Sequence, residues 1–157
     1  MFDVFLNPAK FNHLSKKIFR PIIIISILLL ILGLINIFLF SPDDYQQGSM
    51  VKIMYIHVPA AWLSLFIFFI MTIYSVLSLA FKITFGFIVN KAIAPIGAVF
   101  TLICLTSGSL WGKPMWGTWW VWDARLTSVA ILFIFYLIII FLNQTFKNIE
   151  VREKTVA

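Results

Sequence analysis

The sequence contains few charged residues, and this shortage excludes most soluble folds. Only 11% of the 157 residues are charged, whereas 62% are hydrophobic, and the mean hydropathy is +1.02. Soluble domains carry charge on about a quarter of their residues. A soluble fold of this length could not bury so many apolar side chains, so the solvent must be lipid. The composition therefore predicts an integral membrane protein.

Cysteine is nearly absent, because Cys104 is the only one in the chain. A single cysteine cannot form an intramolecular disulfide. The sequence also has no CxxC or CxxCH motif, so the chain does not itself carry thioether-linked haem or a dithiol redox pair. Since Cys104 lies in an apolar run, we interpret it as a small packing residue.

The sequence also lacks the patterns of nucleic-acid binding and of common catalysis. The net charge is +6, but the basic residues stand in short flanks between apolar runs. This arrangement suits membrane topology and anionic lipid headgroups, so we expect lipid contact and no nucleic-acid partner. No Ser/His/Asp, Cys/His or paired-carboxylate arrangement with catalytic prospects is present. We therefore do not expect an enzyme.

Four long apolar runs are present, each long enough to cross a hydrocarbon core of about 30 Å as a helix. In lipid, helices satisfy all backbone hydrogen bonds internally. We predict an all-α membrane protein with a single domain over residues 1–157. Nine of the twelve Lys and Arg residues lie near the termini or in the 82–91 turn, which predicts cytoplasmic termini. The four transmembrane helices are expected at about 22–40, 59–81, 92–110 and 124–146.

The stretch 111–123, WGKPMWGTWWVWD, contains five of the six tryptophans, and we predict it to be an external loop. An interfacial aromatic belt would explain one or two tryptophans at a helix end. Five tryptophans interrupted by glycine and proline favour a platform for a large planar apolar ligand, and porphyrin fits better than quinone. Trp116, Trp119 and Trp120 would share one side of a helical turn. The candidate ligand-binding residues are Trp111, Trp116, Gly117, Trp119, Trp120, Trp122, Asp123 and Arg125.

His57, in the segment YIHVPAAW, precedes the second predicted span on the same outer face as the tryptophans. We expect Pro59 in the first helical turn and Val58 extended before it, which would fix the direction of His57. Neutral imidazole can ligate iron. An interfacial histidine without a ligand is the alternative, but the neighbouring tryptophans favour ligation. His13 is interpreted as a solvated residue of the basic N-terminal segment.

The charged residues beside the tryptophans allow two interpretations each. Arg125 and Lys113 could anchor the chain at the membrane edge, or they could pair with ligand carboxylates such as the two haem propionates. Asp123 could cap the fourth helix, where an acceptor and a negative charge are favourable. It could equally be a site residue, and the sequence leaves both roles open.

The segment WGTWWVWD, 116–123, resembles the tryptophan-rich signature of the haem-handling proteins of cytochrome c maturation. The longer run WGKPMWGTWWVWDARLTS, together with YIHVPAAW, closely resembles the haem exporter protein C family, also called cytochrome c maturation protein C. The resemblance implies transient, non-covalent binding of haem b on the loop, with His57 as an axial iron ligand. It also implies delivery of haem to a chaperone for c-type cytochrome biogenesis.

The same resemblance implies partners and a location. The partners would be the haem chaperone (maturation protein E), a small helper (protein D) and an ABC-type pair (proteins A and B). The location would be the bacterial inner membrane, or the mitochondrial one. The family has six spans and a second external histidine, whereas this chain stops after four spans. We therefore expect the N-terminal part of a six-span domain or a shortened homologue, without bis-histidine ligation inside this chain.

Two other functions are weighed against haem transfer. A permease subunit of an ABC-type transporter would need polar residues lining a path through the spans. Apart from Arg125 at the edge of the fourth, the predicted spans contain no Asp, Glu, Lys, Arg or His. A quinone-linked oxidoreductase subunit would usually need histidines within the spans to hold haem. Haem transfer at the membrane face is therefore the favoured function.

Overall fold

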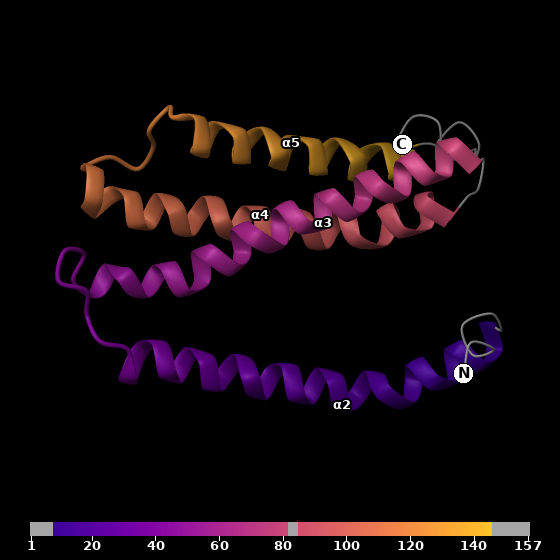
Figure 1. Cartoon of the computed structure of the whole chain (residues 1–157), viewed down its shortest axis with the longest axis horizontal. Coiled ribbons are helices and arrows are strands. Elements are labelled where there is room, and N and C mark those ends of the chain that lie inside the picture. The colour runs from indigo at the N-terminus through magenta and orange to yellow at the C-terminus, as the bar shows by residue number, and fades with distance from the viewer. Residues whose placement is uncertain (1–7, 82–84, 146–157) are drawn as a thin grey trace. The chain divides into compact units, whose positions relative to one another are not determined.

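The computed structural model describes residues 8–81 and 85–145. They fall into two compact units, one within residues 1–42 and one within residues 43–157. In chain order the elements are α2 (Pro8–Ile35), the π-helical turn η1 (Asn36–Phe40), the 3-10 helix η2 (Ser49–Ile53), α3 (Met54–Phe81), α4 (Phe85–Trp116) and α5 (Ala124–Thr145) (Figure 1).

The predicted all-α fold with four helices able to span a membrane is confirmed. The described residues contain four sufficiently long and apolar helical stretches, which are His13–Phe40, Ser49–Phe81, Gly86–Trp116 and Ala124–Thr145. The third has the lowest hydropathy, 1.9, and it is the one that contains Pro95, Gly97 and the Ser107–Ser109 run. The cytoplasmic location of the termini stays a prediction.

The first unit is a single helix with its C-terminal extension. Residues 22–25 are four consecutive isoleucines, so one complete turn of α2 is apolar on every side. A helix that is apolar all round suits lipid contact. At its end, the N–H of Ser41 donates to the Asn36 carbonyl at 2.9 Å and closes the wider turn η1.

Several helix boundaries differ from the sequence-based prediction. The helix α2 begins at Pro8 and not near residue 22, and α4 begins at Phe85, inside the predicted 82–91 turn.

Two further differences affect the site. The helix α3 begins at Met54, so Pro59 lies inside it and Val58 is helical, not extended. The proline removes only the hydrogen bond to the Tyr55 carbonyl, and this loss falls in the first turns. The helix α4 continues past residue 110 to Trp116, and the predicted loop 111–123 is therefore non-helical only from residue 117.

Gly117 ends α4. Its φ of 75° is left-handed, a conformation that glycine adopts without steric cost. Its N–H donates to the Lys113 carbonyl at 3.0 Å, which is the bond of a left-handed helix cap. The predicted helical turn that would align Trp116, Trp119 and Trp120 is therefore wrong, because the helix stops after the first of them.

In the second unit α3, α4 and α5 lie side by side (Figure 1). Tyr136 of α5 is fully buried, and its hydroxyl donates to the Ser64 carbonyl of α3 at 2.7 Å. To reach Ser64, the ring of Tyr136 passes directly over Gly97 of α4, where any Cβ would collide with it. The ring also meets Phe68 edge to face at 5.5 Å. One tyrosine thus ties the three helices together.

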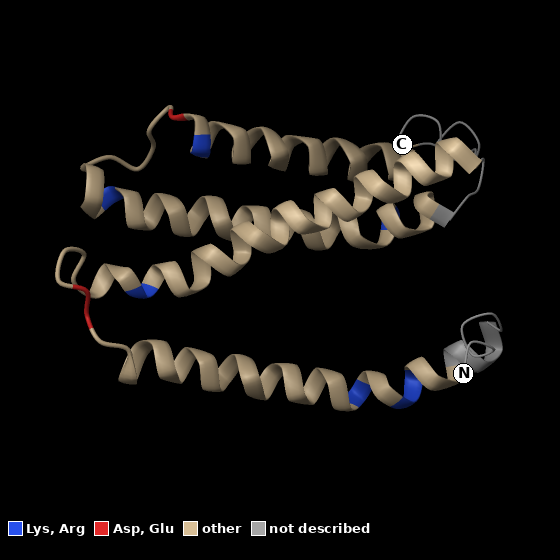
Figure 2. Ribbon diagram, viewed as in Figure 1, with Lys and Arg blue, Asp and Glu red and all other residues tan. Residues whose placement is uncertain are grey.

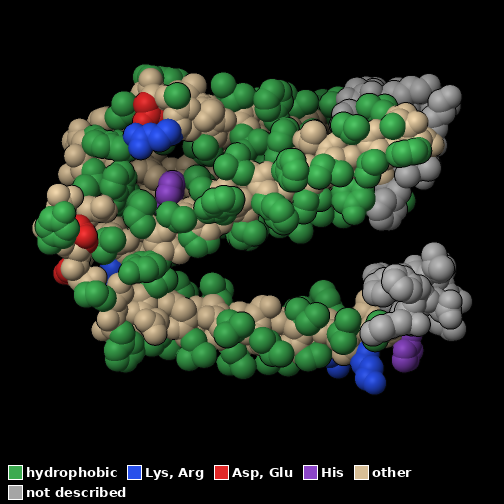
Figure 3. All heavy atoms as spheres, in the orientation of Figure 1, with side chains coloured by type: hydrophobic (Ala, Val, Ile, Leu, Met, Phe, Trp, Pro, Cys, Tyr) green, Lys and Arg blue, Asp and Glu red, His purple; other side chains and the backbone are tan. Residues whose placement is uncertain are grey.

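The charges of the second unit lie toward the helix ends and leave the middle of its helices uncharged (Figure 2). Hydrophobic side chains cover these helices in the space-filling view (Figure 3), as expected for a surface in lipid. The start of α3, the end of α4 and the start of α5 meet at one end of the unit (Figure 1). His57 and the tryptophan-rich stretch are brought together there.

Candidate functional site

His57 lies on α3 and is held against α4 through one ring nitrogen. Its Nδ1 is 3.1 Å from the Cys104 carbonyl oxygen and 3.0 Å from the Ser107 hydroxyl oxygen. Gly108 is what lets the ring come this close, because a Cβ there would lie 3.0 Å from Cε1 of His57. The histidine predicted to share the outer face with the tryptophans is therefore held by α4, the helix that carries Trp111 and Trp116.

Trp111 and Trp116 form the aromatic part of the site on the last turns of α4. Their rings meet edge to face, with centroids 5.1 Å apart. The indole N–H of Trp111 donates to the Gln47 side-chain oxygen at 3.0 Å. Gly112 leaves room for the Trp116 ring, since a Cβ there would lie 3.1 Å from its Cε3 atom.

Asp123 and Arg125 form the polar part of the site where α5 begins. Asp123 caps the helix, one of the two roles that the sequence left open: its carboxylate accepts the Leu126 N–H at 2.8 Å. The same carboxylate accepts from Arg125 Nη2 at 2.8 Å. The Leu126 N–H and the Arg125 guanidinium hold the pKa of the Asp123 carboxyl below its ordinary range. The Arg125 guanidinium also lies over the Trp116 ring, 5.4 Å from its centroid.

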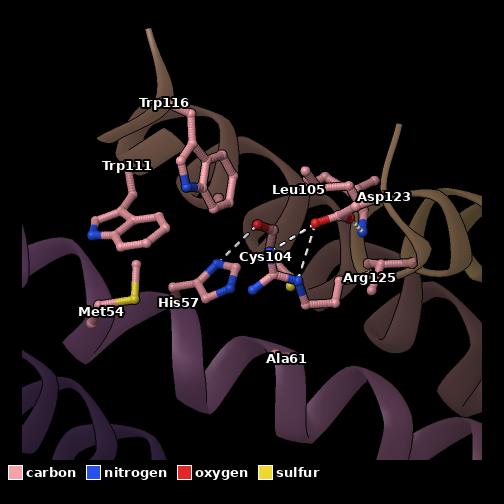
Figure 4. A pocket seen from close by; sticks show the side chains of 12 residues that line it. Met54, His57, Ala61, Cys104, Leu105, Trp111, Trp116, Asp123 and Arg125 are labelled. Atoms are coloured by element: carbon pink, nitrogen blue, oxygen red, sulfur yellow. Dashed lines mark hydrogen bonds and ion pairs between the residues drawn. The ribbon is translucent and has the colours of Figure 1, made fainter. Parts of the chain in front are cut away.

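These side chains surround a pocket of about 320 Å³ (Figure 4). Its walls are mostly apolar, and its polar groups come from three different helix ends. The figure shows His57, Trp116 and Arg125 all pointing into the same space. The lining residues are Met54, His57, Ala61, Cys104, Leu105, Gly108, Trp111, Trp116, Asp123, Arg125, Leu126 and Val129.

Five of the nine predicted site residues line this pocket, and four do not. Gly117 turns the chain away from α4, and Trp119 and Trp122 are 56% and 83% exposed. Trp120 is partly buried against Trp122, with ring centroids 5.6 Å apart. Lys113 donates to the Gly117 carbonyl at 3.0 Å and lies over the Trp119 ring, outside the pocket lining. The predicted platform is thus divided between residues that line the pocket and residues that lie outside it.

The residues that hold His57 were not predicted from the sequence; they are Ser107, Gly108 and Cys104, the last through its carbonyl. The sequence carried a signal for them: residues 104, 107, 108 and 111 follow the i, i+3, i+4, i+7 spacing of one helix face. That signal becomes readable once α4 is known to continue to Trp116. Met54 and Gln47 were also missed, because only the fold brings them beside Trp111.

The donor set limits what the site could bind. Among residues 8–81 and 85–145, no group of three or more His, Cys, Asp and Glu side chains could hold a bare metal ion. One imidazole beside two indoles and a guanidinium suits a metal that brings its own planar ligand. A porphyrin provides that plane, and its carboxylates would suit the guanidinium.

The chain is similar to proteins of one family along its whole length. The family model for heme exporter protein C matches residues 1–157. A heme exporter protein C of Bradyrhizobium diazoefficiens is 51% identical over 131 residues, which are 83% of this chain and 49% of that protein. The Haemophilus influenzae protein of the same name is 45% identical over 150 residues, covering 96% of this chain and 61% of that protein.

A third relative is the heme exporter protein C of Escherichia coli K12, which is 48% identical over 125 residues. That match covers 80% of this chain and 51% of the relative. The chain thus spans about half the length of the curated relatives it matches.

Proposed function

The chain belongs to the heme exporter protein C family, and we propose that it binds haem in the pocket between α3, α4 and α5. The bound haem would be passed on for c-type cytochrome biogenesis. The observation that carries this proposal is the convergence of His57, Trp116 and Arg125 on one apolar pocket from three helices. Together they offer an iron ligand, an aromatic surface and a cation for a propionate.

The small volume of the pocket supports partial and reversible enclosure of a porphyrin. Ligand pockets range from about 300 to 1,000 Å³, and this one, at about 320 Å³, lies at the small end. A porphyrin would insert one part into the pocket and leave another part outside. The exposed indoles of Trp119 and Trp122 offer aromatic surface for that outer part. Incomplete enclosure suits a carrier of non-covalent haem b that must release its cargo.

Arg125 is the better candidate for a propionate than Lys113. Arg125 lines the pocket, and its guanidinium has five N–H donors, of which those on Nε and Nη2 reach Asp123. The other N–H groups of the Arg125 guanidinium therefore remain available to a haem propionate. Lys113 is outside the lining and donates to the Gly117 carbonyl. Asp123 would serve the site indirectly, by orienting Arg125 and starting α5.

We also propose a membrane location and partner proteins for the chain. We place the pocket at the outer, periplasm-like face of a bacterial inner membrane, or of a mitochondrial one, with both termini on the opposite side. The haem would pass to a chaperone, maturation protein E. A small helper protein D and the ABC-type proteins A and B would act beside the chain. The distribution of Lys and Arg supports this orientation.

Binding at the membrane face is favoured over the two alternatives. A permease path would be expected to carry charged groups along the spans, yet the middle of α3, α4 and α5 carries no charge (Figure 2). An oxidoreductase subunit would need histidines deep in the spans, and α3, the one described helix of the second unit with a histidine, carries it near its start. We therefore propose a binding and transfer protein, not an enzyme.

A comparison of tryptophan variants tests this proposal in protein purified into nanodiscs. Trp111→Phe with Trp116→Phe shrinks the aromatic wall, so haem affinity should fall roughly threefold to tenfold. Trp62→Phe is the matched control, because Trp62 is 72% exposed on α3 and outside the pocket. Affinity is measured by optical titration with haem. Equal affinities for the double variant and the control would leave the tryptophans as a membrane belt.

A further inference from the structure

The two contacts at Nδ1 of His57 restrict which ring nitrogen can carry the proton. The Cys104 carbonyl, 3.1 Å away, can only accept a hydrogen bond. The Ser107 hydroxyl, 3.0 Å away, could donate or accept. The state of the ring therefore depends on where the single hydrogen of that hydroxyl lies.

The Ser107 hydroxyl donates its hydrogen to a backbone carbonyl of its own helix, α4. Its Oγ lies 2.6 Å from the Ile103 carbonyl and 3.2 Å from the Cys104 carbonyl, and both of these oxygens only accept. The shorter contact takes the hydrogen, as in the common bond from serine to the carbonyl four residues earlier. The lone pairs of Ser107 Oγ then face Nδ1, so both groups at Nδ1 are acceptors.

We infer that Ser107, acting with the Cys104 carbonyl, is a positioning residue that holds His57 with its proton on Nδ1. In the neutral ring the lone pair is then on Nε2. Within the part of the chain that the structure describes, both hydrogen bonds of His57 are at Nδ1, which leaves Nε2 for a ligand. Because His57 lines the pocket, this nitrogen is presented to it (Figure 4).

This assignment rests on the proposed function for the identity of the ligand, the iron of haem. Metal-bound histidines commonly donate their second N–H to a carbonyl, which fixes the tautomer and raises the basicity of the ligating nitrogen. Gly108 belongs to the same arrangement, because a Cβ there would lie 3.0 Å from Cε1 and push the ring off its acceptors. One turn of α4 therefore fixes the orientation and the tautomer of the His57 ring in the absence of haem.

The tautomer can be measured without haem. The chain has two histidines, so His13→Gln leaves His57 as the only one in protein labelled with ¹⁵N-histidine. At about pH 8.5 the ring is neutral, and ¹⁵N NMR in nanodiscs distinguishes protonated from unprotonated ring nitrogens. We expect a protonated Nδ1 and an unprotonated Nε2. A protonated Nε2 in this parent protein would overturn the inference without any further variant.

Variants then separate Ser107 from general helix structure. Ser107→Ala removes one of the two acceptors, so the ratio of the Nδ1–H to the Nε2–H tautomer should fall roughly fivefold to tenfold. Ser107→Thr keeps the hydroxyl and should restore the ratio. Thr106→Ala is the matched control, because the Thr106 hydroxyl donates to the Leu102 carbonyl at 2.9 Å and to the Ile103 carbonyl at 3.1 Å, on its own helix and not to His57. An equal change in Ser107→Ala and Thr106→Ala would contradict the positioning role.

Haem binding is then measured on the same samples, which keeps the two proposals separable. A protonated Nδ1 in a protein that retains no haem would support the positioning role and refute the proposed function. Normal haem binding with a protonated Nε2 would refute the positioning role alone. With both intact, the Ser107→Ala protein should bind haem severalfold more weakly, and its ferrous iron–histidine Raman stretch should lie at lower frequency, whereas Thr106→Ala should match the parent.

Discussion

At the scale of residues, each contact that haem binding would require is offered by a different side chain. His57 can supply the ligand, Trp116 the aromatic contact and Arg125 the positive charge. Arg125 serves two neighbours at once, since it pairs with Asp123 and lies over Trp116. Losing Asp123 should therefore disturb both the start of α5 and the position of the guanidinium.

The capping role of Asp123 predicts a dependence of stability on pH. The Leu126 N–H and the Arg125 guanidinium lower the folded-state pKa of Asp123 below the ordinary value of 3.8. A lowered pKa means that the stabilisation is complete above about 3.8 and is lost as pH falls through the folded-state value. We expect the thermal unfolding midpoint, followed by circular dichroism, to be constant well above pH 3.8 and to fall as the pH is lowered below that value.

Two variants assign that effect to Asp123. Asp123→Asn keeps a capping acceptor but cannot titrate, so it should retain most of the stability at neutral pH and show a smaller acid-induced decrease. Asp123→Ala should lower the unfolding midpoint already at neutral pH. Identical acid sensitivity in the parent and in Asp123→Asn would assign the effect to other carboxylates.

At the scale of elements, the end of α4 is where sequence and structure differ most. Two glycines and Pro114 indicated a broken loop, yet the helix accommodates all but the second glycine and ends at Gly117. A proline near a helix end removes one hydrogen bond, and the last turns of α4 are also held by the hydrogen bond from the Trp111 indole to the Gln47 side chain. Local propensity could not reveal this tertiary contact. The cap at Asp123, by contrast, depends on local chemistry and was predictable.

The packing of α4 against α5 depends on Gly97. Gly97→Ala places a methyl group where the Tyr136 ring lies, so the ring must move away from its Ser64 partner. Overpacking of this kind costs about 1–3 kcal/mol. The matched control is Gly33→Ala on α2, where an added Cβ meets nothing within 4 Å. Unfolding by SDS titration should show a loss for the first variant and almost none for the second.

At the scale of the whole molecule, composition and run lengths predicted the four apolar helices, because lipid permits few backbone solutions. The residues 104, 107 and 108 that hold His57 were not predicted, since their role depends on which helix faces α3. The face of the membrane on which the site lies follows from the Lys and Arg distribution alone. That orientation stays a prediction.

Cysteine labelling tests the orientation directly. In a Cys104→Ala background, Gln46→Cys and Gln144→Cys place thiols at two exposed positions near opposite ends of the second unit. A membrane-impermeant maleimide added to intact cells should label residue 46 and not residue 144. After lysis both should react. Labelling of residue 144 alone in intact cells would invert the topology and place the pocket on the cytoplasmic side.

The optical spectrum of bound haem is the measurement that decides whether His57 ligates haem iron in this pocket, as we propose. The other histidine in residues 1–157 is His13, in the basic segment before the apolar run of α2. We expect haem with one histidine ligand, so added imidazole should shift the spectrum toward the bis-imidazole low-spin form. His57→Ala should change the spectrum and weaken retention without abolishing it, because Trp116 and Arg125 remain, while His13→Ala should change neither. A spectrum that His57→Ala leaves unaltered would contradict the account.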